Sequence, residues 1–172
     1  DADGRYGVSD LDGAAVTTDV TVEARQTQRE IFEFGSVEVN TTAGGGDFDS
    51  FTEIYDGEGN YLAGTATAGD GYIVARLAPG TYEIDADGRY GVSDLNGASV
   101  TTDVTVEAGQ TQREIFEFGT VEINTTAGGG GFDSFTEIYD GEGNYLTGTS
   151  TAGDGYIVAR LAPGTYEIDA DG

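Results

Sequence analysis

The chain repeats itself at an offset of 84 residues. The segment Asp1–Asp10 recurs without change at Asp85–Asp94, and a third copy begins at Asp169. The overlaid copies differ only at Asp12/Asn96, Ala15/Ser99, Arg25/Gly109, Ser36/Thr120, Val39/Ile123, Asp47/Gly131, Ala63/Thr147 and Ala66/Ser150. Such self-similarity indicates tandem structural units. Because a catalytic chain rarely needs its whole domain twice whereas a rod does, the repeat favours a structural protein that is not an enzyme.

Within each unit, short runs of alternating apolar and polar residues are separated by Gly- and Asp-rich turns. In the run 36–42, Val37 and Val39 share one face, whereas Glu38 and Asn40 share the other. This period of two predicts strands over 36–42, 50–55, 61–67, 72–77, 81–85, 100–108 and 112–118, with a longer loop over 87–97. Core-facing positions are expected at Tyr82, Ile84, Phe116 and Phe118. The predicted fold class is all-β: tandem seven-stranded antiparallel β-sandwich repeats of 84 residues.

The phase of the repeat divides the chain into one complete unit and two fragments. Residues 35–118 form the complete sandwich, residues 1–34 the last two strands of a preceding unit, and residues 119–172 the first five strands of the next. Two accounts follow. The chain is a window of a long covalent array, which we favour, or the strands of 1–34 complete the 119–172 fragment of another subunit. Either way the expected partners are copies of itself, joined end to end.

A family resemblance lies in the strand-and-turn pattern. The stretches Phe51–Asn60, Gly71–Ile84, with Leu77-Ala-Pro-Gly-Thr-Tyr82, and Val104–Gln110 carry it. They resemble the carboxypeptidase regulatory-like and collagen-adhesin B-type domains, which are prealbumin- or immunoglobulin-like sandwiches. The resemblance implies a stalk, spacer or adhesin module of a secreted protein, and therefore an extracellular location at the cell surface. Some members form internal Lys–Asn isopeptide bonds, and this chain has no Lys.

Composition excludes several classes of function. The 32 acidic residues against seven basic ones give a formal net charge of −25, which opposes binding to nucleic acid. Cys and His are absent, so the usual zinc sites, Ser-His-Asp triads and cysteine nucleophiles are ruled out. No run of apolar residues is long enough to span a membrane in this segment.

Two asparagines fit the N-glycosylation pattern. Asn40-Thr41-Thr42 recurs as Asn124-Thr125-Thr126. Because Asn40 alternates with the inward-facing valines, it should face solvent, as glycosylation requires. We therefore expect N-linked glycans at Asn40 and Asn124.

Calcium is the candidate cofactor, although none is required by the predicted fold. Asp85, Asp87 and Asp94 supply clustered oxygen ligands of the kind that Ca²⁺ prefers. Asp-Gly pairs are also ordinary turn residues, and the EF-hand spacing is not completed. Turn chemistry is therefore the default reading, with calcium as the alternative.

These features together predict a rigid, acidic, glycosylated repeat segment of an extracellular filament or fibril. The alternative is an adhesin repeat that binds carbohydrate or a partner surface through Tyr55, Tyr61, Tyr72 and Tyr82, which we otherwise expect to serve packing.

Overall fold

The computed structural model describes residues 2–7, 9–67 and 69–172. Over these residues the chain consists of strands, turns and extended segments, which confirms the all-β prediction, and it contains no helix that could cross a membrane. The strands are β1 (Ala2–Tyr6), β2 (Ser9–Val16), β3 (Gly35–Ala43), β4 (Gly46–Asp47), β5 (Phe51–Asp56), β6 (Tyr61–Ala66), β7 (Tyr72–Leu77), β8 (Gly80–Tyr90), β9 (Ser93–Val106), β10 (Thr111–Asn124), β11 (Thr126–Ala127), β12 (Gly130–Gly131), β13 (Phe135–Asp140), β14 (Tyr145–Ser150), β15 (Tyr156–Leu161) and β16 (Tyr166–Asp171).

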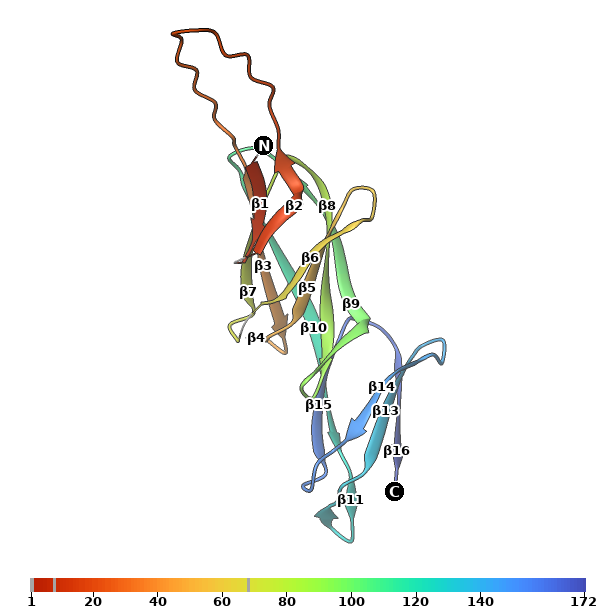
Figure 1. The fold of residues 1–172 in the computed structure, drawn as a ribbon. Helices are drawn as coiled ribbons and strands as arrows, with labels where there is room; N and C mark the ends of the chain where they lie inside the picture. The colour runs from red at the N-terminus through yellow and green to blue at the C-terminus, as the bar shows by residue number, and fades with distance from the viewer. Residues whose placement is uncertain (1, 8, 68) are drawn as a thin grey trace.

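The central unit packs two sheets face to face (Figure 1). One sheet contains β1, β7, β3 and the first half of β10, and the other contains β6, β5, β8 and β9. Alternate side chains from both sheets meet in one core, where Val37, Val39, Ile54, Ile84 and Phe116 are at most 2% exposed. The predicted inward-facing positions Val37, Val39, Tyr82, Ile84, Phe116 and Phe118 are all buried, which confirms them.

One strand pair runs parallel. β10 lies beside β3 in the same direction, with Thr111 opposite Ser36 and Phe118 opposite Ala43. The predicted wholly antiparallel arrangement is therefore wrong at this pair. The reason lies in the repeat: β10 continues past Gly119 and becomes the first strand of the following unit, as β3 is of the central one. If successive units have the same orientation, the first strand of each unit points the same way. The strand β10, which becomes the first strand of the second unit, must therefore run parallel to β3.

The predicted loop over 87–97 is also wrong. β8 and β9 extend through it as a hairpin, which turns at Gly91 with a φ of 59°. The tip of this hairpin reaches the next unit, where Tyr90 and Arg89 of β8 pair with Ala159 and Arg160 of β15. The Asp- and Gly-rich composition is typical of a loop, but the backbone finds its hydrogen-bond partners in the neighbouring repeat.

The same contact is seen at the start of the chain. The hairpin of β1 and β2 pairs with β7 through Arg5 opposite Arg76 and Tyr6 opposite Ala75. We call the pair of β1 and β2, and residues 86–100, the linking hairpins. Each extends from one repeat and completes a sheet of the following one.

The second sandwich is less complete than the central one. It contains the three-stranded sheet β14–β13–β16, and β15 paired with the second half of β10. Ile138 and Leu161 are buried in its core together with Tyr90 and Leu95 of the linking hairpin. Val121 and Ile123 of β10 remain half-buried, whereas the equivalent Val37 and Val39 are fully buried.

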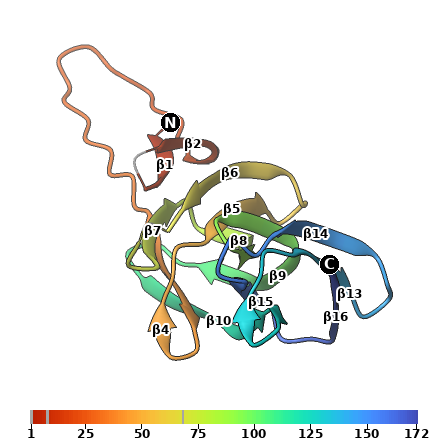
Figure 2. The same cartoon turned by 90° about the horizontal axis from the view of Figure 1, so that it is seen from below.

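Residues 17–34 form no strand. They follow β2 as an extended loop that projects away from both sandwiches in the two views (Figures 1 and 2). Their equivalents, residues 101–118, form the second half of β9 and the first half of β10. The two segments differ only at Arg25/Gly109, so it is the available partner and not the sequence that decides whether they are strands.

Candidate functional site

The junction between repeats is built from the linking hairpin and β15. Beyond the ladder pairs, the amide of Gly91 donates to the carbonyl of Val158 at 2.9 Å, and the amide of Ala162 donates to the carbonyl of Ala98 at 3.0 Å. Both strands of the hairpin thus contribute hydrogen bonds to the next unit. A flexible tether would leave these groups to solvent, so the junction is a shared sheet rather than a linker.

Gly88 allows the hairpin to lie this close. A Cβ atom at Gly88 would lie 2.7 Å from the carbonyl oxygen of Arg160 and 2.8 Å from that of Ala98. At the first junction Gly4 has the same surroundings, 2.7 Å from the oxygen of Arg76. Both glycines are required by close backbone approach, since neither has a positive φ.

Tyr90 anchors the hairpin in the neighbouring core. Its ring is 1% exposed, and its hydroxyl is hydrogen-bonded to that of Thr136 in β13. Burial raises the pKa of the Tyr90 hydroxyl above its ordinary value. Tyr6 repeats the arrangement with Thr52 of β5. An apolar ring with one satisfied polar group is well suited to specify a single docked position.

A polar contact flanks the same junction. Arg89 of the linking hairpin forms an ion pair with Asp49 of the central unit, with Nη1 3.1 Å from Oδ2, and donates to the Asp49 carbonyl at 2.8 Å. Arg160 of β15 lies over the ring of Phe48, 5.5 Å from its centroid. Half-exposed pairs of this kind contribute less than about 1 kcal/mol each and mainly fix orientation.

The sequence predicted none of these junction residues. Gly88, Arg89 and Tyr90 fall in the segment that was expected to be a loop. The available signal was the alternation of Ala86, Gly88 and Tyr90, which face the same side of β8 and are all buried. A tyrosine inside an Asp- and Gly-rich stretch indicates that one face of this stretch is packed against other residues.

The predicted calcium ligands are placed on two strands. Asp85 and Asp87 lie in β8, and Asp94 lies in β9, exposed and directly opposite Arg89. Among the described residues no three acidic side chains gather in a way that could hold a metal ion. Instead, each accepts a hydrogen bond from β9: Asp85 from the Thr101 hydroxyl and Asp87 from the Ser99 hydroxyl. Calcium binding stays a prediction.

Asp87 is the most perturbed carboxyl group of the junction. Its residue is 5% exposed, and its Oδ1 accepts a hydrogen bond of 2.9 Å from the Ser99 hydroxyl. Burial, together with the nearby charges of Asp85, Glu53 and Asp94, raises the pKa of Asp87 to about 6, although the hydrogen bond from Ser99 acts in the opposite direction. The carboxylate form therefore opposes folding at neutral pH.

We expect Asp87→Asn to stabilise the chain at pH 7. The pKa of Asp87 is higher in the folded chain than its ordinary value of 3.8, so its favourable contribution is complete below pH 3.8 and is lost as the pH rises to about 6. Because one pKa unit corresponds to about 1.4 kcal/mol, the variant should gain roughly 2–3 kcal/mol at pH 7. Urea unfolding at pH 4 and pH 7 measures this gain.

The matched control for this variant is Asp171→Asn. Asp171 is the equivalent carboxylate of the second sandwich and is exposed, so its replacement should change stability by no more than about 0.5 kcal/mol. A gain at Asp87 that is equal at pH 4 and pH 7 would contradict the assigned role of its charge.

The two predicted glycosylation sites differ in exposure. Asn40 lies in β3 between β7 and β10 and is half-buried, whereas Asn124 lies at the end of β10 and is exposed. The side chains of Thr41 and Thr125 are turned into the sandwiches, where each hydroxyl donates to a carbonyl, of Phe48 and Phe132 respectively. Glycosylation stays a prediction, with Asn124 the more accessible acceptor.

The tyrosines divide into packed and exposed ones. Tyr82 is 5% exposed and donates to the carbonyl of Ala78, which confirms its core position. Tyr61 packs edge-on against Tyr55, with ring centroids 5.7 Å apart, yet is itself 55% exposed. Tyr72 is 42% exposed. Binding of carbohydrate to the exposed rings stays a prediction.

Comparison with known proteins gives a general likeness only. No family model and no curated protein sequence matches the chain. Among solved structures it is similar to the Bacillus anthracis TIE protein (16% identity, TM-score 0.39, covering 80% of this chain and 28% of that one). It is also similar to a streptococcal ancillary pilin (15%, 0.38, 80% and 53%) and to the shaft pilin SpaA of Lactobacillus rhamnosus GG (11%, 0.38, 80% and 77%). The chain spans about half or less of the first two. At TM-scores this low, the likeness assigns neither family nor function.

Proposed function

We propose that the chain is a structural segment of an extracellular surface filament or stalk, built of tandem 84-residue sandwiches. The observation that carries this proposal is the linking hairpin, which belongs to one repeat and completes a sheet of the next. A protein that needed independent modules would separate them with a polar linker. Here a hairpin of one repeat forms part of a sheet of the next, so the arrangement holds successive sandwiches in a fixed row.

Two connections make the junction between the central and the second sandwich stiff. The linking hairpin pairs with β15, and β10 passes without interruption from the central sandwich into the second. Bending the junction would break ladder hydrogen bonds and would expose Tyr90 and Leu95 to water, and both changes are unfavourable. Stiffness of this kind suits a shaft, and it is a mechanical rather than a catalytic function.

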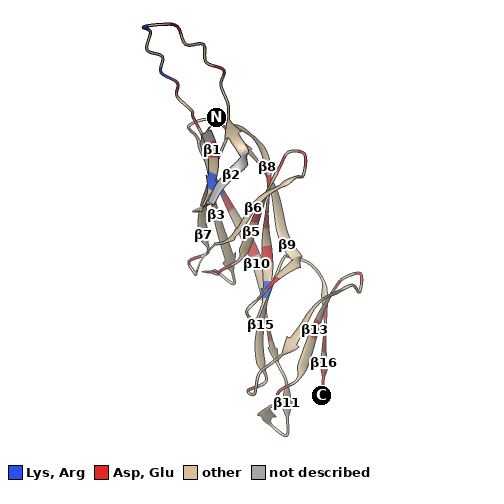
Figure 3. Ribbon diagram, viewed as in Figure 1, with Lys and Arg blue, Asp and Glu red and all other residues tan. Residues whose placement is uncertain are grey.

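The surface charge suits the same role. Acidic residues are spread over strands and loops of both sandwiches, with few basic residues among them (Figure 3). A negative charge over the whole surface makes neighbouring filaments repel one another and disfavours non-specific association. Glycans at Asn40 and Asn124 would add to this separation.

Labelling of intact source cells tests the proposal. Gold-conjugated antibodies raised against the 172-residue chain should decorate filaments or stalks at the cell surface, and mass spectrometry of peptides from the same material should show glycan on Asn124 more than on Asn40. Label confined to the cell interior would contradict the proposed function. Unmodified asparagines on labelled filaments would contradict only the glycosylation.

A further inference from the structure

A bulge interrupts the linking hairpin where it contacts the second sandwich. The β8–β9 ladder is paired at Leu95 and again at Val100, and between these positions residues 96–99 face the single residue Asp87. Residues 96–99 therefore have no partner residue in the ladder. Bulges leave the backbone of the longer strand unpaired and bend that strand locally, so this part of β9 is held less firmly than the strand on either side of it.

The bulge contains the one Asn-Gly pair of the chain, Asn96-Gly97. Both residues are exposed, and the side chain of Asn96 has no hydrogen-bond partner among the described residues. The Ser99 hydroxyl donates to the backbone carbonyl of Asn96 at 2.6 Å, which fixes the backbone of the bulge and leaves the side-chain amide free. Because Gly97 has no side chain, its own residue does not shield its backbone nitrogen.

An asparagine in this setting loses its side-chain amide by an intramolecular reaction. The backbone nitrogen of Gly97 attacks the Cγ carbon of Asn96, the Cγ–Nδ2 bond breaks, and the amide group leaves as ammonia with the proton from the Gly97 nitrogen. Water then opens the five-membered succinimide at one of its two carbonyl groups. One opening gives an aspartyl residue, and the other gives an isoaspartyl residue, in which the main chain runs through the former side chain.

Asn60 and Asn144 provide internal controls for this reaction. Both are exposed, as Asn96 is, but their side-chain amides are held: each Nδ2 donates to an aspartate Oδ2 at 2.8 Å, of Asp56 and Asp140 respectively. Each is also followed by a tyrosine, whose side chain obstructs the approach to the backbone nitrogen. Exposure alone therefore does not provide the geometry found at Asn96.

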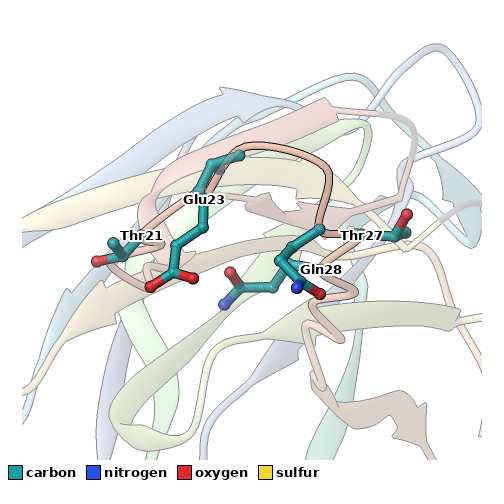
Figure 4. A pocket seen from close by; sticks show the side chains of 6 residues that line it. Thr21, Glu23, Thr27 and Gln28 are labelled. Atoms are coloured by element: carbon teal, nitrogen blue, oxygen red, sulfur yellow. The ribbon is translucent and has the colours of Figure 1, made fainter.

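A glutamine gives the same contrast. Gln28 lines the cavity of about 340 Å³ in the segment 17–34, together with Glu23 and Thr27 (Figure 4). It is exposed, and its Nε2 donates to Oε1 of Glu30 at 2.8 Å. Its longer side chain would have to close a six-membered ring, which forms much more slowly, so we expect Gln28 to stay intact.

The inner side of the bulge is packed against the second sandwich. A Cβ atom at Gly97 would lie 2.4 Å from Cδ2 of Leu146 in β14. The next residue, Ala98, is 2% exposed, and its carbonyl accepts the hydrogen bond from the amide of Ala162. An isoaspartyl linkage adds one carbon to the main chain directly before Gly97. Since residues 97 and 98 are in close contact with their neighbours, the longer main chain displaces them from the second sandwich.

We propose that Asn96 is a deamidation site of the folded chain and that its isoaspartyl product loosens the junction between repeats. The aspartyl product is compatible with the junction, because the equivalent residue of the preceding linking hairpin is Asp12. The inference goes beyond the proposed filament and does not require it. It gives the junction a slow covalent change that accumulates with the age of the protein.

Peptide mass spectrometry of the 172-residue chain after storage at neutral pH measures the reaction. Asn96 should convert at least about tenfold faster than Asn60 or Asn144, because a glycine follows it. Its rate in the folded chain should lie within about tenfold of its rate in guanidinium, since the bulge reacts without opening of the sheet. Asn96→Gln is the blocked variant and should give no product at this position.

Two results would overturn the assignment of the site. One is a rate in the folded chain that is more than about tenfold below the rate in the unfolded chain, which would show that the hairpin protects Asn96. The other is conversion of Asn60 or Asn144 as fast as that of Asn96. Neither result bears on surface labelling of source cells, so the proposed filament stands or falls on that experiment.

Hydrogen exchange tests the effect on the junction. The isoaspartyl form, separated by chromatography, should exchange at least about tenfold faster over the linking hairpin and at the amide of Ala162 than the unmodified chain does. Asn96→Asp is the matched control, because it adds the same charge without lengthening the main chain, and its exchange should stay close to that of the unmodified chain. Equal exchange in the isoaspartyl form and in Asn96→Asp would overturn the proposed loosening.

Discussion

Phe116→Ala should lower the free energy of unfolding of the central sandwich by about 3–5 kcal/mol, whereas Phe32→Ala should change it by less than about 0.5 kcal/mol. The two phenylalanines occupy equivalent positions in identical local sequences. Phe116 is 2% exposed in the core formed by β3, β5 and β8, so its removal leaves a cavity there. Phe32 lies in the extended segment 17–34, outside every strand.

Urea unfolding of both variants measures this difference. Guanidinium unfolding followed by tyrosine fluorescence provides a second probe of the same transition. Similar losses for both variants would contradict the position of Phe32 outside the core.

Gly88→Val should undock the linking hairpin, at an expected loss of about 3 kcal/mol or more from the junction. The new Cβ would have to occupy a position 2.7 Å from the Arg160 oxygen and 2.8 Å from the Ala98 oxygen, and both are backbone atoms that cannot turn aside. Withdrawal of the hairpin would also take Tyr90 and Leu95 out of the second core.

Hydrogen exchange measured by mass spectrometry locates this loss. Amide protection should fall over the linking hairpin and β15, and it should be retained in β3, β5 and the first half of β8. Gly153→Val is the control, because a Cβ at Gly153 meets nothing within 4 Å; its effect should stay within about 0.5 kcal/mol. Unchanged protection in Gly88→Val would show that the two repeats do not share a sheet.

The sequence was sufficient for the core and insufficient for the junctions. Val37, Val39, Tyr82, Ile84, Phe116 and Phe118 were predicted to face inward, and all six are buried. The alternation of apolar residues reports that one face of a strand is covered, and this is a local property. It does not reveal which repeat supplies the residues that pack against this face.

The errors follow from that limit. The segment 87–97 was assigned to a loop because Asp and Gly dominate it, yet its partner strand β15 lies about seventy residues further along the chain. The parallel pairing of β10 with β3 depends on how successive units advance, and no local pattern encodes that. Residues 17–34 have strand-like alternation and are not strands, because pairing requires a second sheet.

The continuity of β10 determines how a shaft of these repeats would carry load. β10 runs along the long axis of the molecule and is bonded to β3 on one part of its length and to β15 on the other (Figure 1). A pull between the two ends therefore acts along these ladders and strains their hydrogen bonds together in shear, instead of opening them one at a time. The overlap that joins the repeats is thus also the element that resists their separation under tension.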